Sequence, residues 1–211
     1  MNLKQMLTPS SYRPYRRAKH PLLGFSNQEF IFIHINKCGG SSIIKSIWPV
    51  HKWHDTAKEI IDMIGVEKYR STSKFTVVRN PWSKVVSQYN YRIQTQQNDL
   101  AATKLSFKQW LLKTYGDIKD PTLYDVPKMF QTQLWWLKDQ DGQVNVDYII
   151  RFENLRSDFL RVSKILGIKK PIPHRNKSKA VDYKTYFDEE SKDIVATFFK
   201  EDIEYFGYSF D

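Results

Sequence analysis

The sequence predicts an α/β protein with a mainly parallel sheet flanked by helices. Apolar runs of strand length recur along the chain, and segments of helical periodicity lie between and after them. Alternation of this kind is typical of parallel sheets, because each helix carries the chain back to the starting edge of the sheet. With 211 residues, 41% of them hydrophobic, the chain is long enough for one core of ordinary size.

Three apolar runs are predicted to be buried strands. They are FIFIHI at 30–35, KFTVVR at 74–79 and VDYIIRFE at 146–153. Residues 1–24 contain three prolines and several basic residues, so they predict an irregular basic arm. The α/β domain is therefore expected to span residues 25–211.

Helix signals fill the intervals between the strands. A short helix is expected over 41–48, directly after a Gly-Gly turn. Next, Thr56 and Glu59 have the spacing of a capping box, and this helix should end at Gly65. A longer helix should follow the second strand, with Asn80 as N-cap and Pro81 at the first helical position.

The second half of the chain predicts further helices. SFKQWLLKTYG (106–116) and PKMFQTQLWWLKDQDG (127–142) each read as one helix that closes near a glycine. The last segment, 188–210, is amphipathic. Its apolar face is expected to carry Ile194, Val195, Phe198, Phe199 and Ile203.

The composition bounds the environment and the partners. Lys and Arg number 33 against 23 Asp and Glu, a net charge of +10, which suggests an anionic partner: nucleic acid, an acidic glycan, a phosphorylated cofactor or a membrane surface. The denser group Arg13, Arg16, Arg17 and Lys19 suits either such a partner or a solvated surface.

A single cysteine excludes an internal disulfide, and no run of about 18 apolar residues occurs, so we expect a cytoplasmic protein without a membrane span.

The loop after the first strand predicts an anion site. Gly39 and Gly40 allow a sharp turn that brings backbone N–H groups close to an anion. Ser41 and Ser42 can add hydroxyl donors at the start of the helix, and Lys37 can add a compact cation. A phosphate-binding Walker loop places its lysine after the glycines, whereas here the lysine precedes them.

A second candidate anion site follows the second strand. Arg79 ends that strand, and Ser87 comes eight residues later in the second turn of the next helix. Arginine can grip a phosphate as a bidentate fork, and serine can add a neutral donor. Both side chains could therefore reach one phosphate group.

Together, the stretches IHINKCGGSS and VVRNPWSKVVSQY closely resemble the two cofactor signatures of the sulfotransferases. The similarity is greatest to the carbohydrate-type branch that includes the heparan 2-O-sulfotransferases and bacterial members. It extends over nearly the whole chain, through HDTAKEI, DYIIRFENLRSDF, HRNKSKAVDYKTYFDEES and DIEYFGYSF.

The resemblance implies a donor and a set of ligands. The loop would bind the 5′-phosphosulfate of 3′-phosphoadenosine 5′-phosphosulfate (PAPS), and Arg79 with Ser87 would bind its 3′-phosphate. Lys177 or Ser178, in the HRNKSK loop, would lie near the 3′-phosphate. No metal site is implied. Cys38 departs from the threonine usual in related loops, which removes one hydroxyl donor and leaves the backbone N–H groups.

Sulfuryl transfer to an alcohol needs a base for the acceptor hydroxyl and a stabilised leaving oxygen. Lys37 is the natural leaving-group stabiliser. Among five histidines, His54 matches the family histidine that precedes a helix, and the positive end of that helix favours its neutral form. His51 is the alternative base. His34 is expected to be a core or sheet residue within the first strand.

The acceptor that the resemblance and the basic charge favour is a glycan hydroxyl, with an acidic oligosaccharide as one option. Lipid-linked sugars and small metabolites are the alternatives. Two other functions compete with sulfuryl transfer. A P-loop kinase would need Gly-Lys-Ser/Thr at the end of the loop and an acidic strand end, whereas residues 39–42 read Gly-Gly-Ser-Ser and the second strand ends in Arg79. A nucleic-acid binder fits the net charge, but the sequence carries no recognisable nucleic-acid-binding module, so we expect no nucleic-acid partner.

Overall fold

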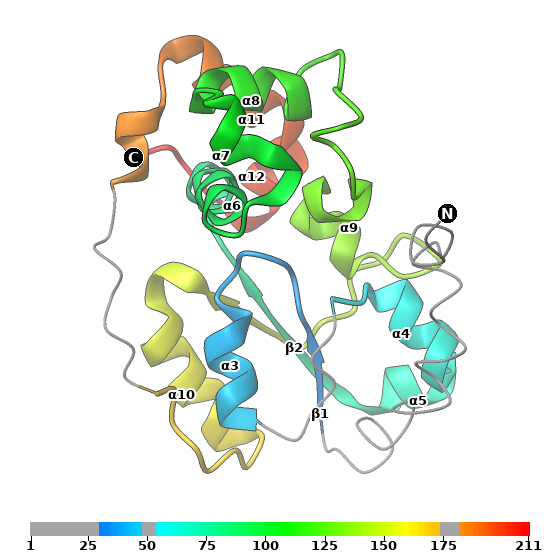
Figure 1. The fold of residues 1–211 in the computed structure, drawn as a ribbon. Helices are drawn as coiled ribbons and strands as arrows, with labels where there is room; N and C mark the ends of the chain where they lie inside the picture. Colours follow the sequence, from blue (N-terminus) through cyan, green and yellow to red (C-terminus); the bar gives the residue numbers. More distant parts are fainter. Residues whose placement is uncertain (1–29, 48–53, 174–181) are drawn as a thin grey trace, which may run out of the picture.

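A three-stranded sheet with its covering helices forms one half of the molecule, and a group of helices forms the other (Figure 1). We call these the sheet half and the helical half. The computed structural model describes residues 30–47, 54–173 and 182–211. The expected α/β class, with a parallel sheet flanked by helices, is confirmed.

All three strands run parallel, in the spatial order β1–β2–β3. The strands are β1 (Phe30–Ile33), β2 (Ser73–Val78) and β3 (Tyr148–Arg151). Ile33 lies opposite Thr76, and Val78 lies opposite Arg151. Because the strands are parallel, their carboxyl ends share one edge of the sheet, and the residues that follow them meet there.

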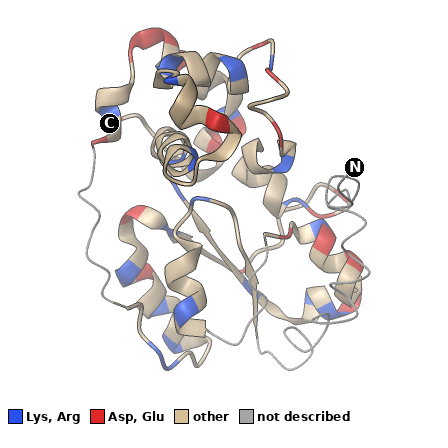
Figure 2. Ribbon diagram, in the orientation of Figure 1, with Lys and Arg blue, Asp and Glu red and all other residues tan. Residues whose placement is uncertain are grey.

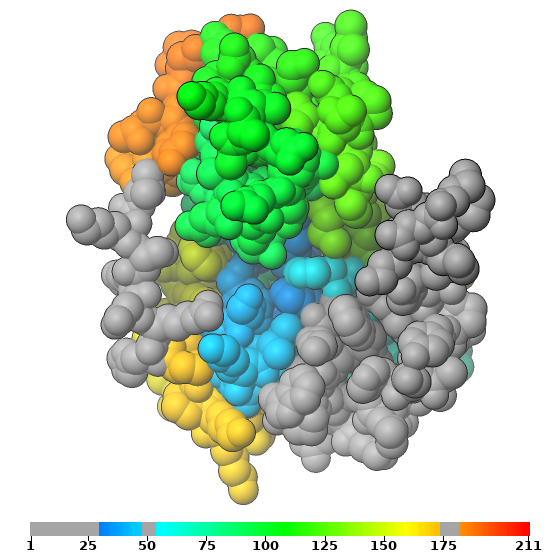
Figure 3. Space-filling view, in the orientation of Figure 1, coloured from blue at the N-terminus to red at the C-terminus, as the bar shows by residue number. Residues whose placement is uncertain are grey.

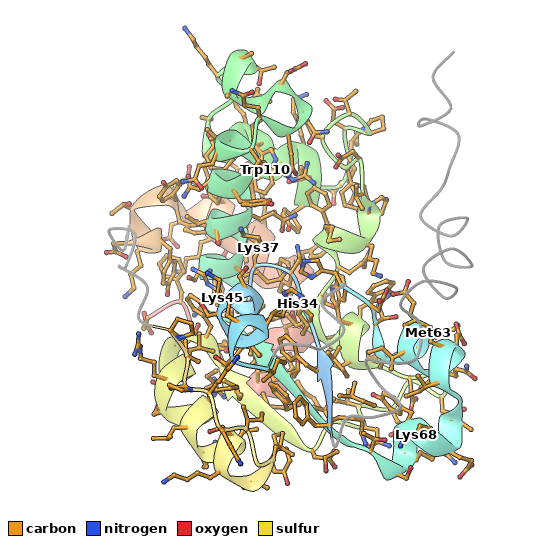
Figure 4. All side chains as sticks on the ribbon, turned by 60° about the horizontal axis from the view of Figure 1, so that its bottom comes forward. His34, Lys37, Lys45, Met63, Lys68 and Trp110 are labelled. Carbon is orange, nitrogen blue, oxygen red and sulfur yellow. The ribbon has the colours of Figure 1, made fainter. Side chains whose placement is uncertain are left out.

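In the described part of the chain, the sheet is covered by α3 (Gly40–Ile47), α4 (Ala57–Ile64), α5 (Val66–Ser71) and α10 (Leu155–Ile165), and the buried apolar residues of α9 (Gln133–Leu137) join the same core. In both ribbon views α3 and α10 lie on one side of the strands, and α4 and α5 lie on the other (Figures 1 and 4). Ile31, Ile33, Phe75 and Ile150 are completely buried between these layers. Burial on both faces explains why the strands read as continuous apolar runs.

The helical half is built around α6 (Pro81–Gln94), which leaves the end of β2. Its other members are η2 (Gln97–Asp99), α7 (Leu100–Thr103), α8 (Phe107–Tyr115), η3 (Pro127–Phe130), α9 (Gln133–Leu137), η5 (Tyr183–Tyr186), α11 (Glu189–Phe198) and α12 (Lys200–Phe206). Trp110, Phe130, Val195 and Phe199 are fully buried in its core. A short turn, η4 (Phe152–Asn154), joins β3 to α10.

Several predicted helix boundaries are confirmed. The Thr56–Glu59 capping box is formed, and α4 ends at Gly65. The side chain of Asn80 accepts hydrogen bonds from the first N–H groups of α6, and Pro81 begins that helix. The helix expected over 106–116 is α8, with Ser106 and Gly116 as its caps.

One predicted helix is wrong in its extent. Residues 127–142 do not form one helix, because Gln131 and Thr132 are extended and separate η3 from α9. The segment 188–210 divides into α11 and α12 at Phe199. Its five apolar residues nevertheless all pack into the core of the helical half, as their spacing predicted.

The basic side chains are spread over both halves of the described structure (Figure 2). The predicted arm at 1–24 and its group of arginines lie outside the described residues. Within residues 30–47, 54–173 and 182–211, no helix combines the length and the apolar character needed to cross a bilayer.

Candidate active site at the ends of the strands

The loop between β1 and α3 lies at the edge where the strands end. Lys37 and Gly39 both have left-handed backbone, with φ of 62° and 80°. The chain then enters α3 at Gly40, and Ser42 N donates a hydrogen bond to Gly39 O over 3.0 Å. The first N–H groups of α3, its positive end, therefore begin at this loop. In the space-filling view the blue loop reaches the surface between α6 and α3 (Figure 3).

Arg79 connects the two predicted anion motifs directly. Its Nη1 donates a hydrogen bond to the backbone carbonyl of Lys37 over 3.1 Å. Its Nε and Nη2 both donate to Ser83 Oγ, over 2.9 and 2.8 Å. Two segments that are far apart in the sequence thus meet at one guanidinium group, at the junction of the sheet half with the helical half.

Phe152, just after β3, contacts both motifs. The guanidinium of Arg79 stacks on the Phe152 ring, 4.1 Å from its centroid. A Cβ atom added to Gly39 would lie 2.9 Å from Phe152 Cδ2, closer than real carbon atoms approach. Glycine is therefore needed at position 39 for two reasons: the backbone has a positive φ, and a side chain would clash with Phe152. All three strands contribute a residue to the site at their carboxyl ends.

One face of α6 continues the site away from the sheet. Ser83, Ser87 and Tyr91 follow one another at intervals of four residues, so they share that face. Ser83 is the direct partner of Arg79, and Ser87, the predicted partner, lies one turn further along. Lys37 reaches the same face, because its Nζ lies 3.7 Å from the centroid of the Tyr91 ring.

His34 was expected to be a buried residue inside the first strand: its burial is confirmed, and its place in the strand is wrong. β1 ends at Ile33, so His34 begins the loop, although it is buried. Its ring packs against the ring of His54 with 3.9 Å between centroids. A Cβ atom on Gly40 would lie 2.0 Å from His34 Nε2. Gly40 is therefore needed to make room for His34, and Figure 4 shows His34 and Lys37 at the same junction.

The hydrogen bond of His54 defines its tautomer. Its Nδ1 lies 2.9 Å from the carbonyl oxygen of His34. A carbonyl only accepts hydrogen bonds, so Nδ1 carries the proton, and in the neutral ring Nε2 keeps its lone pair. Burial lowers the pKa of His54, and the charges of Lys128 and Lys37 act in the same direction. The bond to His34 and the charge of Asp55 oppose this shift.

Cationic groups dominate the electrostatics of the site. Burial lowers the pKa of Lys37 to about 8, and the nearby charge of Arg79 contributes. Burial also lowers the pKa of Arg79 and of Lys84. Lys84 lies on α6 and is fully buried, and its Nζ has no hydrogen-bond partner among the residues that the structure describes. An anion at this loop would therefore enter a region of positive potential.

Cys38 points away from the surface of the loop. It is 1% exposed, and its Sγ lies 3.4 Å from both Asn36 O and Gln133 Oε1. Burial raises the pKa of the thiol to about 12, so Cys38 stays protonated and neutral. Its side chain thus supports the loop from inside.

The remaining predicted residues divide into two groups. Ser41 is exposed and Ser42 is half-buried at the start of α3. His51, Lys177 and Ser178 lie outside the described residues.

Four further residues contact the predicted site residues and were not predicted from the sequence: Ser83, Tyr91, Gln133 and Phe152. Helical spacing from Arg79 and Ser87 is a signal for Ser83 and Tyr91. Phe152 and Gln133 arrive from distant segments and carry no local signal.

Comparison with known proteins gives the family. Residues 22–209 match the model of the Sulfotransferase family. An uncharacterized protein of Archaeoglobus fulgidus is 28% identical over 123 residues, which are 58% of this chain and 91% of that protein. The crystal structure of a sulfotransferase from Alicyclobacillus acidocaldarius aligns with 84% of this chain and 93% of its own, with a TM-score of 0.44 and 15% identity. Because the family model spans nearly the whole sequence, this chain belongs to the sulfotransferase family.

Proposed function

We propose that this protein transfers a sulfuryl group from PAPS to a hydroxyl of a carbohydrate acceptor. Family membership supports sulfuryl transfer from a sulfonate donor to a hydroxyl-bearing acceptor in general. The observation that carries the more specific proposal is the hydrogen bond from Arg79 to the carbonyl of Lys37. It joins a loop suited to one phosphate with an arginine suited to another, and PAPS is a nucleotide with two separate anionic groups.

The described residues suit these two anionic groups. Lys37 and the N–H groups of residues 39–42 would hold the 5′-phosphosulfate, as preorganised donors at a helix start do for phosphates. Arg79 would hold the 3′-phosphate, together with the hydroxyls of Ser83 and Ser87 on the same helix face. From the sequence resemblance alone, Lys177 and Ser178 are proposed as additional ligands of the 3′-phosphate.

His54 is the proposed general base. Its Nδ1 is occupied by the carbonyl of His34, so Nε2 is the nitrogen that takes the proton of the acceptor hydroxyl. As the acceptor oxygen bonds to sulfur, the bond from sulfur to the 5′-phosphate oxygen breaks. The ammonium of Lys37 stabilises the negative charge that develops on that leaving oxygen. The lowered pKa of His54 keeps the ring neutral at physiological pH, which this role requires.

The acceptor is proposed to be a glycan, with acidic oligosaccharides included. The resemblance to the carbohydrate-type branch and the net charge of +10 support this choice. Incubation with sulfur-labelled PAPS and a panel of neutral and acidic glycans tests it, because labelled sulfate should appear on at least one glycan.

The same assay tests the base. His54→Ala should lose about 10²–10⁴ in rate, because the acceptor proton then has no positioned base. His51→Ala should retain most of the rate. Normal turnover by His54→Ala together with loss in His51→Ala would move the base to His51. Labelled phosphate transfer from ATP, with no sulfate transfer to any acceptor, would contradict the proposed reaction.

A further inference from the structure

We propose that Gln133 is a positioning residue that sets the separation of the two anion-binding motifs, so that one ligand with two phosphate groups spans both. The inference rests on the proposed function, because it assumes that the loop and Arg79 hold different phosphates of one nucleotide. Gln133 is the first residue of α9 and is completely buried. It would touch no part of the ligand itself.

The amide of Gln133 contacts both motifs at once. Its Oε1 accepts a hydrogen bond from Arg79 N over 2.8 Å, and its Nε2 donates to Arg79 O over 2.9 Å. The same Oε1 lies 3.4 Å from Cys38 Sγ in the loop. One side chain therefore satisfies both backbone groups of Arg79 directly after β2 ends, and it also reaches the neighbour of Lys37.

Asp202 of α12 fixes the orientation of Gln133. Its Oδ2 accepts hydrogen bonds from Gln133 N over 2.6 Å and from Gln133 Nε2 over 3.3 Å. Its Oδ1 accepts from Leu134 N over 2.9 Å. Because the carboxylate only accepts, it keeps Nε2 on its own side and leaves Oε1 to face Arg79 N and Cys38. The amide thus has one orientation that satisfies all its partners.

This arrangement makes the two motifs one rigid unit. A rotation of the Gln133 amide would break both hydrogen bonds to the partly buried N–H and C=O of Arg79, and a backbone group that is shielded from water is costly to leave unpaired. The backbone at Arg79 and the loop at Cys38 therefore keep a fixed separation. A ligand that must contact both gains affinity from this preorganisation, whereas a ligand that contacts one motif does not.

The test compares two ligands that differ only in the 3′-phosphate. Calorimetry gives the dissociation constants of 3′-phosphoadenosine 5′-phosphate and of adenosine 5′-phosphate, and their ratio measures the benefit of spanning both motifs. The unmodified protein should bind the bisphosphate about 10–100-fold more tightly than adenosine 5′-phosphate. This factor corresponds to the free energy of charged hydrogen bonds to the second phosphate.

Gln133→Leu should reduce the ratio about tenfold while the affinity for adenosine 5′-phosphate changes less than about threefold. Asp202→Asn keeps the glutamine and removes an acceptor that holds it, so it should reduce the ratio in the same direction by a smaller factor. If Gln133→Leu does not fold, the ratio of dissociation constants measured for Asp202→Asn tests the inference. The folded state of each variant is checked by circular dichroism.

Gln88→Leu is the matched control. Gln88 is also a buried glutamine that uses both ends of its amide, donating to Met129 O over 3.2 Å and accepting from Tyr115 Oη over 3.0 Å. Its removal should lower stability and leave the ligand ratio unchanged.

Two results would overturn the inference. One is an unchanged ratio in folded Gln133→Leu and Asp202→Asn. The other is an equal loss of affinity for both ligands, which would make Gln133 a structural residue only. The proposed function fails separately: an unmodified protein that does not prefer the bisphosphate would contradict the assignment of Arg79 before Gln133 is tested.

Discussion

The guanidinium of Arg79 and the backbone carbonyl of Lys37 are joined by a hydrogen bond of 3.1 Å. This bond links the end of β2 to the loop after β1, and the stacking of Arg79 on Phe152 adds the residue that follows β3. The three strand ends therefore hold one another in place through a single side chain. Such an arrangement suits a ligand that carries charge at two points, and it leads to predictions at individual residues.

Arg79→Ala should weaken binding of 3′-phosphoadenosine 5′-phosphate by about 1.5–3 kcal/mol, because a charged contact with the 3′-phosphate is lost. Ser83→Ala and Ser87→Ala should each cost about 0.5–1.5 kcal/mol, the value of a neutral donor. Calorimetry measures all three. Arg161→Ala is the control, since that arginine lies on α10 with its side chain 69% exposed. An Arg79→Ala variant with unchanged affinity would remove Arg79 from the site.

The pH dependence of kcat/KM should be bell-shaped. His54 must be neutral, and burial places its pKa below the ordinary value of about 6.5, so activity should fall only on the acidic side of that value. Lys37 must be charged, so activity should fall again as pH rises through about 8. His54→Ala should abolish the acidic limb in its residual activity and keep the alkaline one. An acidic limb centred above 6.5 would contradict the assigned environment of His54.

Gly40→Ala should lower both stability and turnover. The added Cβ would meet the His34 ring at 2.0 Å, and that ring is buried against His54 and cannot move freely. Thermal unfolding and sulfate transfer measure the two effects. Lys45→Ala, at an exposed position of the same helix and outside the proposed site, is the control. His34→Ala in the Gly40→Ala background should restore thermal stability, and failure to do so would place the clash elsewhere.

Lys84→Met should lower the melting temperature by roughly 2–6 °C, because the buried carboxylate of Asp202 then loses a cation that favours its charged form. Differential scanning calorimetry measures the change. Lys45→Met, on the exposed side of α3, should leave the melting temperature nearly unchanged. A higher melting temperature in Lys84→Met would contradict this, because the cost of burying the ammonium would then exceed its attraction to Asp202.

Local signals in the sequence were sufficient for the parallel sheet and for most helix starts. The Thr56–Glu59 box and the Asn80–Pro81 start depend on neighbouring residues only, and both are formed. The break between η3 and α9 also has a local signal that was missed, because Thr132 is the N-cap of α9 and its side chain accepts a hydrogen bond from Trp135 N. Asp202, which accepts hydrogen bonds from the start of α9 from far along the chain, is a tertiary contribution without such a signal.

The same distinction applies to the site. Lys37, Gly39 and Arg79 were predicted as site residues because strand-to-helix turns have a local signature, and the structure brings them together. The burial of His34 was predicted correctly, but its position in the first strand was not. The strand ends one residue before it, so His34 lies at the start of the loop. Gln133 was missed because its role comes entirely from tertiary contacts.

The central claim is that the site binds a nucleotide with two separate phosphate groups and needs no metal. Calorimetric measurement of nucleotide binding in the presence of EDTA tests it most directly. It needs no knowledge of the acceptor. We expect 3′-phosphoadenosine 5′-phosphate to bind with undiminished affinity after chelation, because Lys37, the loop N–H groups and Arg79 would hold its phosphates directly. ATP, which lacks a 3′-phosphate, should bind far more weakly at equal concentration. Strong binding of ATP that depends on Mg²⁺, with none of the bisphosphate, is the behaviour of a Walker-type kinase and would contradict the proposed reaction.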